Sequence, residues 1–425
     1  MAKEKPTSRN PWFWVPSLYY AEGIPYVMVM TVSVAFYKRL NVSNTDIALF
    51  TSLLYFPWVL KPLWSPSIDI VKTKRFWIVL MQSIVVIGLT GVALVTTLPD
   101  FFLYTLLFFS LIAISSATHD IAADGFYMLG LNQSQQAFYV GIRSTFYRLA
   151  MATGGIVLIF AGYFEGEMSI PSAWKITFIL ITILFFLFFV YHKFILPYPE
   201  TDKPAPKETS FFSEFIKIYK LFFKKKHIGL SVAFLLIYRF GEAQLVKLAQ
   251  PFLLDPKNVG GLGLSTGQVG LAYSTLGIIA LSLGGILGGL VVSKGGLKKW
   301  IWWMFAAINL PHVLYIYLSF FQPDNFFLIT LCVAGEQFGY GFGFTAYMLY
   351  MIFISEGEFK TSHFALCTGF MALSMMIPGA FSGAIQEYLG YKLFFVWILI
   401  TMIPGYFIIR ALPIEPEFGK KTNNK

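Results

Sequence analysis

The chain has 425 residues, of which 56% are hydrophobic and only 13% are charged, and its formal net charge is +10. Soluble domains carry roughly 25% charged residues, so this composition excludes a protein whose surface mostly faces water. It indicates a membrane protein instead. A basic balance is also typical of nucleic-acid binding, but the Lys and Arg residues of this chain follow membrane topology, and no nucleic-acid partner is expected.

The N-terminus predicts a retained first membrane span. The first ten residues, MAKEKPTSRN, are polar and basic, and the apolar run that begins at Pro11 has no small-residue cleavage site after a short hydrophobic core. The two cysteines, Cys332 and Cys367, lie in apolar runs, so neither a disulfide framework nor a Cys/His metal site is expected.

Twelve apolar runs are long enough to span a bilayer, which needs ~20 residues. In chain order, these runs are 12–37, 44–66, 76–97, 101–127, 136–163, 173–197, 226–254, 266–292, 299–320, 324–354, 362–387 and 392–412. The fold class predicted from them is an all-α membrane protein of the major facilitator type, with twelve transmembrane helices in two pseudo-symmetric six-helix bundles.

A polar stretch at 198–225 separates two proposed domains, an N-terminal half at 1–197 and a C-terminal half at 226–425. This predicted cytoplasmic loop is either disordered or carries an amphipathic helix, FFSEFIKIYKLFF, on the membrane surface. A repeat supports the two halves: SPSIDIVKTKRFW and GGLVVSKGGLKKW are both basic turns, and their Trp77 and Trp300 are 223 residues apart. Parallel six-helix halves are the plan of major facilitator transporters.

The basic residues predict the orientation. With both termini in the cytoplasm, 22 of the 32 Lys and Arg residues fall inside, 5 fall outside and 5 lie within spans. Because cytoplasmic loops carry an excess of Lys and Arg, this ratio predicts cytoplasmic termini.

Charged residues inside spans are the main functional signal, because each costs upwards of ~2.5 kcal/mol near the bilayer centre. They are Glu22, Lys61, Asp120, Asp124, Arg143, Arg148, Arg239, Glu242, Lys247 and Glu336. We expect them to line a polar central cavity, where acids carry protons and bases bind anionic substrate groups. The alternative is a set of buried ion pairs that lock helices together or gate the cavity.

Spacing refines this expectation. Asp120 and Asp124 are four residues apart and share one helix face, with His119 as their neighbour. Arg239 and Glu242 are three apart and able to pair.

Three further kinds of motif predict a gate, sugar contacts and close helix packing. The turn with Asp69, Lys74 and Arg75 predicts a cytoplasmic gate, with a loop that is merely solvated as the alternative. The aromatic residues Tyr26, Trp58, Trp64 and Tyr340 could stack on sugar rings, although membrane belts and core packing explain most aromatic residues in such chains. The runs LGGILGGLVV and GYGFGF predict close helix packing, and the second could also loosen its helix near Glu336.

Several motifs together resemble the AmpG family of anhydromuropeptide permeases, whose relatives include acetyl-CoA carriers. In chain order, these motifs are GIPY, PWVLKPLWSPSIDI, ATHDIAADG, FYRLAMATGG, FGEAQ, KTSHFALCTGFMAL and PGAFSGAIQEYLGY. The chain departs from the family where His119 replaces a usual Gln and Glu242 replaces a usual Asp.

The resemblance implies proton-driven import of N-acetylglucosaminyl-anhydromuropeptides across the bacterial inner membrane. The proton-coupling candidates are Asp120, Asp124, Glu22, Glu336 and His119. The substrate-binding candidates are Lys61, Arg143, Arg148, Tyr26, Trp64, Arg239, Glu242 and Tyr340. The expected partners are a glycopeptide or sugar and membrane lipid, with the proton as coupling ion, no cofactor, no metal and a monomeric state.

Two alternatives stay open at this point. The same fold could carry an oligosaccharide or an acetyl-CoA-type solute, or the protein could be a membrane receptor or scaffold that transports nothing. An enzyme is not expected, because no nucleophile–base or metal constellation is apparent.

Overall fold

The computed structural model describes residues 9–131, 133–203, 211–357 and 360–420. Helices dominate these residues, and no strand occurs among them, as the predicted all-α class requires. Helices satisfy their own backbone hydrogen bonds, which lipid cannot do.

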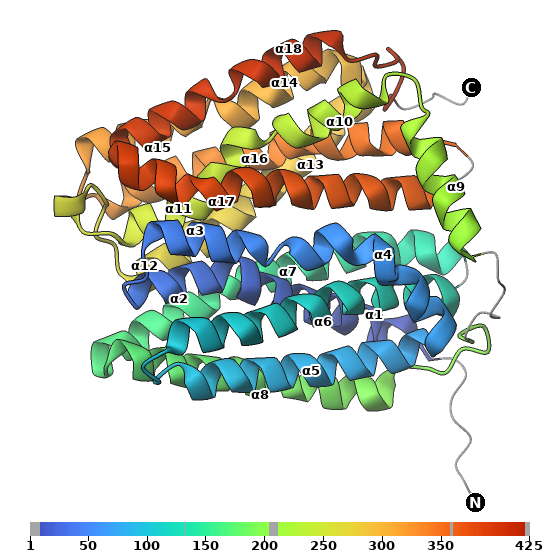
Figure 1. Cartoon of the computed structure of the whole chain (residues 1–425), viewed down its shortest axis with the longest axis horizontal. Coiled ribbons are helices and arrows are strands. Elements are labelled where there is room, and N and C mark those ends of the chain that lie inside the picture. The colour runs from blue at the N-terminus through green and yellow to red at the C-terminus, as the bar shows by residue number, and fades with distance from the viewer. Residues whose placement is uncertain (1–8, 132, 204–210, 358–359, 421–425) are drawn as a thin grey trace, which may run out of the picture. The chain divides into compact units, whose positions relative to one another are not determined.

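The chain forms two compact units, and the first comprises the described residues within 1–42, 60–207 and 266–270. Figure 1 shows α5 beside α6 and α8 in this unit, and α1 packs on α7. Its elements are the 3-10 turn η1 (Pro11–Phe13), α1 (Val15–Val27), the π-helical η2 (Met28–Val32), α2 (Ser33–Arg39), most of α4 (Phe56–Val71), α5 (Lys74–Val95), α6 (Phe101–Gly130), α7 (Gln133–Glu167), α8 (Ile170–Ile195) and α12 (Thr266–Val269).

The second unit comprises the described residues within 43–59, 208–265 and 271–425. Within it, α13 and α14 pack on α16, and α11 packs on α17. Its elements are α3 (Asn44–Leu53), α9 (Phe211–Phe223), α10 (Ile228–Ile237), α11 (Phe240–Leu254), the 3-10 turn η3 (Lys257–Val259), most of the π-helical η4 (Gly270–Leu276), α13 (Gly277–Gly295), α14 (Leu297–Asn309), α15 (His312–Phe321), α16 (Phe326–Ser355), α17 (Lys360–Ile400) and α18 (Ile403–Ala411). The predicted domain boundaries at 197 and 226 stay a prediction.

The described part of the chain contains eleven helical segments long and apolar enough to cross a membrane. The last, Ser362–Ala411, has 50 residues, which at ~1.5 Å per residue is about two and a half times the length that a bilayer core of ~30 Å needs. It bends at Gly390, where φ is +70°, a value that favours glycine. The predicted spans 362–387 and 392–412 lie on either side of this bend, so the twelve-span architecture is confirmed.

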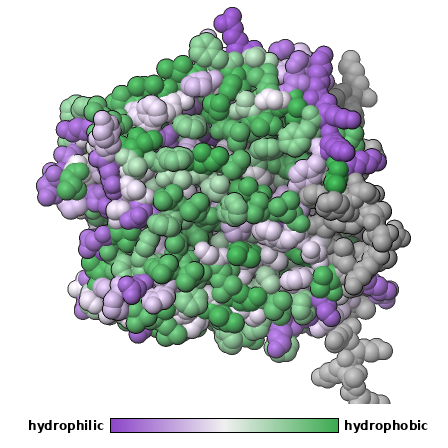
Figure 2. All heavy atoms as spheres, viewed as in Figure 1, coloured by the Kyte–Doolittle hydropathy of each residue, from purple (hydrophilic) through white to green (hydrophobic). Residues whose placement is uncertain are grey.

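The outer surface of the protein is largely apolar. Figure 2 shows a face on which hydrophobic residues predominate. Large side chains such as Leu107, Phe327 and Ile87 are more than half exposed. Such exposure would be unfavourable in water, but it is the surface that a lipid-embedded helix needs.

The central segment contains the helix that its sequence pattern favoured. Within α9, the Phe222 ring is buried and stacks on Phe370 of α17 with the ring centroids 6.3 Å apart. His363 of α17 lies against the same ring. This side of α9 therefore packs on protein rather than on lipid.

Small residues bring α16 close to its neighbours, as the glycine-rich runs predicted. A Cβ atom on Gly341 would lie 1.9 Å from the Leu281 carbonyl oxygen, and one on Gly343 would lie 2.5 Å from the Met304 carbonyl oxygen. The expected loosening near Glu336 is wrong, because α16 continues as one helix from Phe326 to Ser355.

Two glycines of α13 test this packing. A Cβ at Gly284 would meet the Phe338 carbonyl oxygen at 2.1 Å, whereas a Cβ at Gly289 would have no heavy atom within 4 Å. We expect Gly284→Ala to lower the free energy of unfolding by about 1–3 kcal/mol through overpacking. Gly289→Ala, the control on the same helix, should be neutral or stabilising by up to ~1 kcal/mol. Unfolding in detergent measures both, and equal stabilities would contradict the packing.

Candidate functional site

The first unit holds a cluster of charged side chains from four helices. The Lys61 ammonium of α4 lies 2.5 Å from Asp120 Oδ2 of α6. The Arg143 guanidinium of α7 lies 3.0 Å from Asp124 Oδ1, one turn further along α6. The two predicted bases are therefore paired with the two predicted acids, one base to each acid.

Tyr19 of α1 completes the second of these pairs. Its hydroxyl donates a hydrogen bond to Asp124 Oδ1 at 3.0 Å and accepts one from Arg143 Nη1 at 2.9 Å. The guanidinium also lies over the rings of Tyr19 and Tyr127, 4.5 and 5.0 Å from their centroids. These contacts fix the position of Arg143, whose planar group suits a carboxylate.

Glu22 of α1 is the third acid of the cluster, and it is buried. It interacts electrostatically with Asp120 and Asp124, and its Oε2 atom has no hydrogen-bond partner among the described residues. Three acids thus face two bases, Lys61 and Arg143. Fully ionised, the cluster has a formal charge of −1, which one proton would neutralise.

A second polar chain leads away from this cluster. His119 Nε2 and His192 Nδ1 lie 3.0 and 2.9 Å from the Gln82 amide nitrogen, and His192 Nε2 lies 3.0 Å from the Ser17 hydroxyl. His119, His192 and Gln82 are all buried. His119 is next to Asp120 in the chain, yet its ring binds Gln82 of α5 and not a carboxylate.

In the second unit, Arg239 lies at the break between α10 and α11. Its guanidinium donates to the Tyr340 hydroxyl and lies over the rings of Phe344 and Tyr347, 4.7 and 5.6 Å from their centroids. The spacing made a pair of Arg239 with Glu242 possible, and the two side chains do interact electrostatically, but the direct contacts of the guanidinium are with the aromatic side chains of α16.

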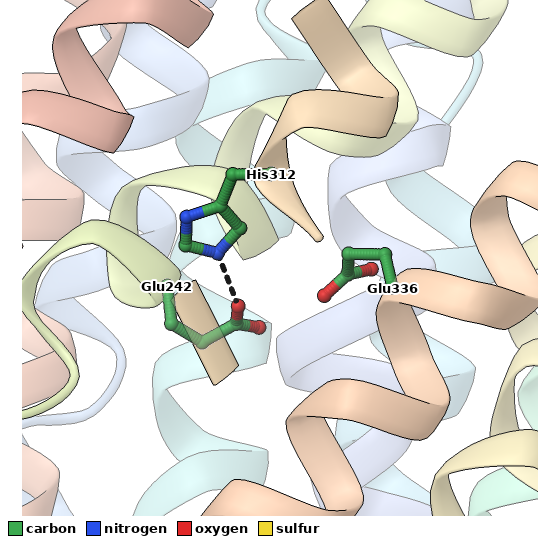
Figure 3. A group of neighbouring side chains, drawn as sticks. All are labelled: Glu242, His312 and Glu336. Atoms are coloured by element: carbon green, nitrogen blue, oxygen red, sulfur yellow. Dashed lines mark hydrogen bonds and ion pairs between the residues drawn. The ribbon is translucent and has the colours of Figure 1, made fainter. Parts of the chain in front are cut away.

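Glu242 pairs instead with His312 of α15, whose Nε2 lies 3.1 Å from Glu242 Oε2. Glu336 of α16 completes this group, in which one ligand atom from each residue lies within 4.8 Å of the others. Figure 3 shows the three side chains converging from three helices. Because all three are buried, the group could hold a cation, either a proton or a metal ion.

The remaining predicted substrate contacts are dispersed. Arg148 of α7 is exposed, and Tyr26 of α1 is partly buried. Trp64 of α4 packs beside a buried cluster that includes Trp14, and its indole N–H has no hydrogen-bond partner among the described residues. Lys247, a further charge in α11, is buried and donates to the Thr51 hydroxyl at 3.0 Å.

Two of the residues predicted to form a gate, Lys74 and Arg75, lie at the start of α5, where a carboxylate caps the helix. The Asp202 carboxylate accepts the backbone N–H groups of Lys74 and Arg75 at 2.7 and 3.0 Å, where α5 begins. A carboxylate is favourable at this end of a helix. Arg75 also donates to the Lys193 carbonyl oxygen at 2.5 Å. The third predicted gate residue, Asp69, has a side chain that lies outside the described part of the chain.

Sequence reasoning missed Tyr19, His312 and Asp202. The signal for His312 was a polar residue inside a predicted span, the same signal that identified Glu242 and Glu336. Asp202 lies in a polar stretch where an acid is unremarkable, and Tyr19 is one of 23 tyrosines. Neither of these two had a local signal.

Comparisons with known proteins agree with this architecture. Residues 18–356 match the Major Facilitator Superfamily. The "Putative transporter AmpG 4" of Rickettsia felis is 25% identical over 417 residues, which cover 94% of each chain. The "Anhydromuropeptide permease" of Escherichia coli (strain K12) is 22% identical over 417 residues, or 96% of this chain and 80% of that protein. The predicted resemblance to AmpG proteins is confirmed.

A solved structure shares the fold. The nucleoside transporter NupG superposes with a TM-score of 0.71 at 14% sequence identity, and the match covers 94% of this chain and 98% of that one. At this identity, the likeness concerns the fold alone.

The pairing of Lys61 with Asp120 can be measured by a double-mutant cycle. Both side chains are only about one-fifth exposed, so we expect Lys61→Met and Asp120→Asn to show a coupling of about 1–3 kcal/mol in the free energy of unfolding. The pair Lys420–Glu417, with Glu417 79% exposed, serves as a control and should couple by less than ~1 kcal/mol. Equal couplings for the two pairs would contradict a structural ion pair at Lys61.

Proposed function

The chain belongs to the Major Facilitator Superfamily and is a multi-pass membrane transporter rather than an enzyme, and we propose that it imports anhydromuropeptides together with protons. The single observation that carries the proton coupling is the cluster of Glu22, Asp120 and Asp124 with only two basic partners. The solute is proposed from the similarity to a protein named as an anhydromuropeptide permease.

Glu22 is the first proton acceptor in this proposal. Asp120 and Asp124 each have a cationic partner, which favours their ionised forms, whereas Glu22 is buried with an unpartnered oxygen. Sequence reasoning had placed Asp120 and Asp124 first. Because these two acids are paired with cations, the proposed proton acceptor is Glu22 instead.

The same cluster offers a way to couple the proton to the solute. Arg143 is held by Asp124 and Tyr19, and a carboxylate of an incoming glycopeptide would compete with Asp124 for the guanidinium. Asp124, displaced from its cation, would then be an uncompensated negative charge beside Glu22, and Glu22 would take up a proton more readily. Solute binding and proton binding would therefore favour each other, which is the thermodynamic requirement for symport.

The proposed location is the bacterial inner membrane, with both termini in the cytoplasm and transport from periplasm to cytoplasm. The distribution of basic residues supports this orientation. Alternating access would proceed by movement of one repeat against the other. In this account, Lys74 and Arg75, capped by Asp202, lie at the cytoplasmic end of the first unit.

A competition assay tests the solute. Uptake of labelled N-acetylglucosaminyl-anhydromuropeptide into proteoliposomes should be inhibited by the unlabelled compound, because both would bind the same basic groups. Chitobiose, which has the sugars without the carboxylates, and acetyl-CoA should inhibit weakly or not at all. Accumulation of labelled acetyl-CoA or chitobiose, without uptake of the muropeptide, would assign the other solute. Absence of any accumulation would favour a receptor or scaffold.

A second experiment tests the coupling acid. In Glu22→Gln, muropeptide uptake driven by an inward proton gradient should fall to the level reached without a gradient, because the isosteric amide binds no proton. Exchange of internal for external muropeptide, which needs no net proton movement, should persist. Glu165→Gln is the matched control, since Glu165 is satisfied by Arg39, Trp174 and Thr266. Full gradient-driven uptake by Glu22→Gln would remove Glu22 from this role.

A further inference from the structure

The buried group of Glu242, His312 and Glu336 has no part in the coupling proposed for the first unit. Its three residues come from α11, α15 and α16, and each side chain is at most 1% exposed. One ligand atom from each residue lies within 4.8 Å of the others. Two buried carboxyl groups at this separation cannot both remain ionised without a compensating cation.

Each of the two carboxyl groups has one oxygen without a hydrogen-bond partner among the described residues. Glu242 Oε2 is bonded to His312 Nε2 at 3.1 Å, and Glu336 Oε2 accepts from the Gln337 amide at 2.9 Å. The other oxygen of each carboxyl group, Oε1, is buried and has no hydrogen-bond partner among the described residues. Buried polar atoms are nearly always satisfied, so a missing donor is indicated between the two acids.

With His312 neutral, the two acids have one basic partner, so the group lacks one positive charge. Arg239 is the cation that interacts electrostatically with Glu242. The other titratable neighbours of the acids among the described residues are Tyr273, Tyr315 and His312. The tyrosines carry no positive charge, and His312 carries none in its neutral form. Lys247 lies on α11 five residues beyond Glu242, about 140° around the helix, and it donates to Thr51.

We infer that Glu242 and Glu336 share one bound proton, with His312 holding Glu242 in place, and that this group is a second proton-binding site. One proton makes the group neutral with Arg239 and supplies the hydrogen that the two Oε1 atoms lack. A proton fits better than a metal ion. A proton leaves the hydrogen bond between His312 Nε2 and Glu242 Oε2 in place, whereas a metal ion bound by this nitrogen would take its lone pair and break that bond.

The site extends the proposed proton coupling to the second unit. In each unit, the acids of the group outnumber the basic side chains that interact with them by one, three to two around Asp120 and, with His312 neutral, two to one around Glu336. The inference rests on the proposed function only for its role in transport. Proton binding itself can be measured without any transported solute.

Infrared spectroscopy of the purified full-length protein in liposomes tests the site directly. The C=O stretch of a protonated carboxylic acid is separate from the bands of carboxylates and amides. At neutral pH, without solute, the wild-type spectrum should contain this band, and Glu336→Gln should lose the contribution of one group. Glu242→Gln should lose or shift the same contribution, because the proton is shared.

Control measurements distinguish this site from a metal site and from carboxyl groups elsewhere in the protein. Glu165→Gln should keep the band, because its carboxylate is paired with Arg39. If one of the two variants, Glu336→Gln or Glu242→Gln, does not fold, the other still tests the site. A wild-type spectrum without any protonated carboxyl band overturns the inference on its own. Loss of the band on addition of ZnCl₂, with a matching change in the carboxylate bands, would overturn it in favour of a metal site. Muropeptide uptake can fail while the band is present, so the two proposals fail separately.

Discussion

Removing an ionised side chain from water costs several kcal/mol unless the side chain is paired, and this cost determines how the charged residues of the spans are arranged. In the first unit, Lys61 and Arg143 neutralise Asp120 and Asp124, while Glu22 remains without a cation of its own. A transporter can use such a deficit, because a proton that neutralises a buried acid also changes which groups are available to a solute. In the proposed mechanism, this deficit is what binds the proton.

The helices serve this arrangement by bringing charges from distant parts of the sequence together. Asp120 and Asp124 lie one turn apart on α6, so their partners must come from α4 and α7 at matching heights. In the second unit, the break before α11 sends Arg239 toward Tyr340, which leaves Glu242 for His312. Close helix contacts at glycines such as Gly284 and Gly341 hold α16, which carries Glu336, against its neighbours.

Much of this was accessible from the sequence, because spans and intramembrane charges have strong one-dimensional signals. All twelve predicted spans correspond to helices, and the two acids of α6 follow from a spacing of four residues. Pairing was not accessible in the same way. Which base meets which acid depends on helix rotation, and the partnership of Glu242 with His312 joins residues 70 positions apart. Asp202 was missed because a helix cap supplied from another segment leaves no mark in the local pattern.

The central claim is that a proton moves with the solute, and the reversal potential tests it most directly. Proteoliposomes containing the protein are given fixed gradients of N-acetylglucosaminyl-anhydromuropeptide, and the membrane voltage at which net flux stops is measured at several pH gradients. The account predicts that this voltage shifts with the pH gradient, because protons contribute to the driving force. A voltage that does not change with the pH gradient would contradict proton coupling.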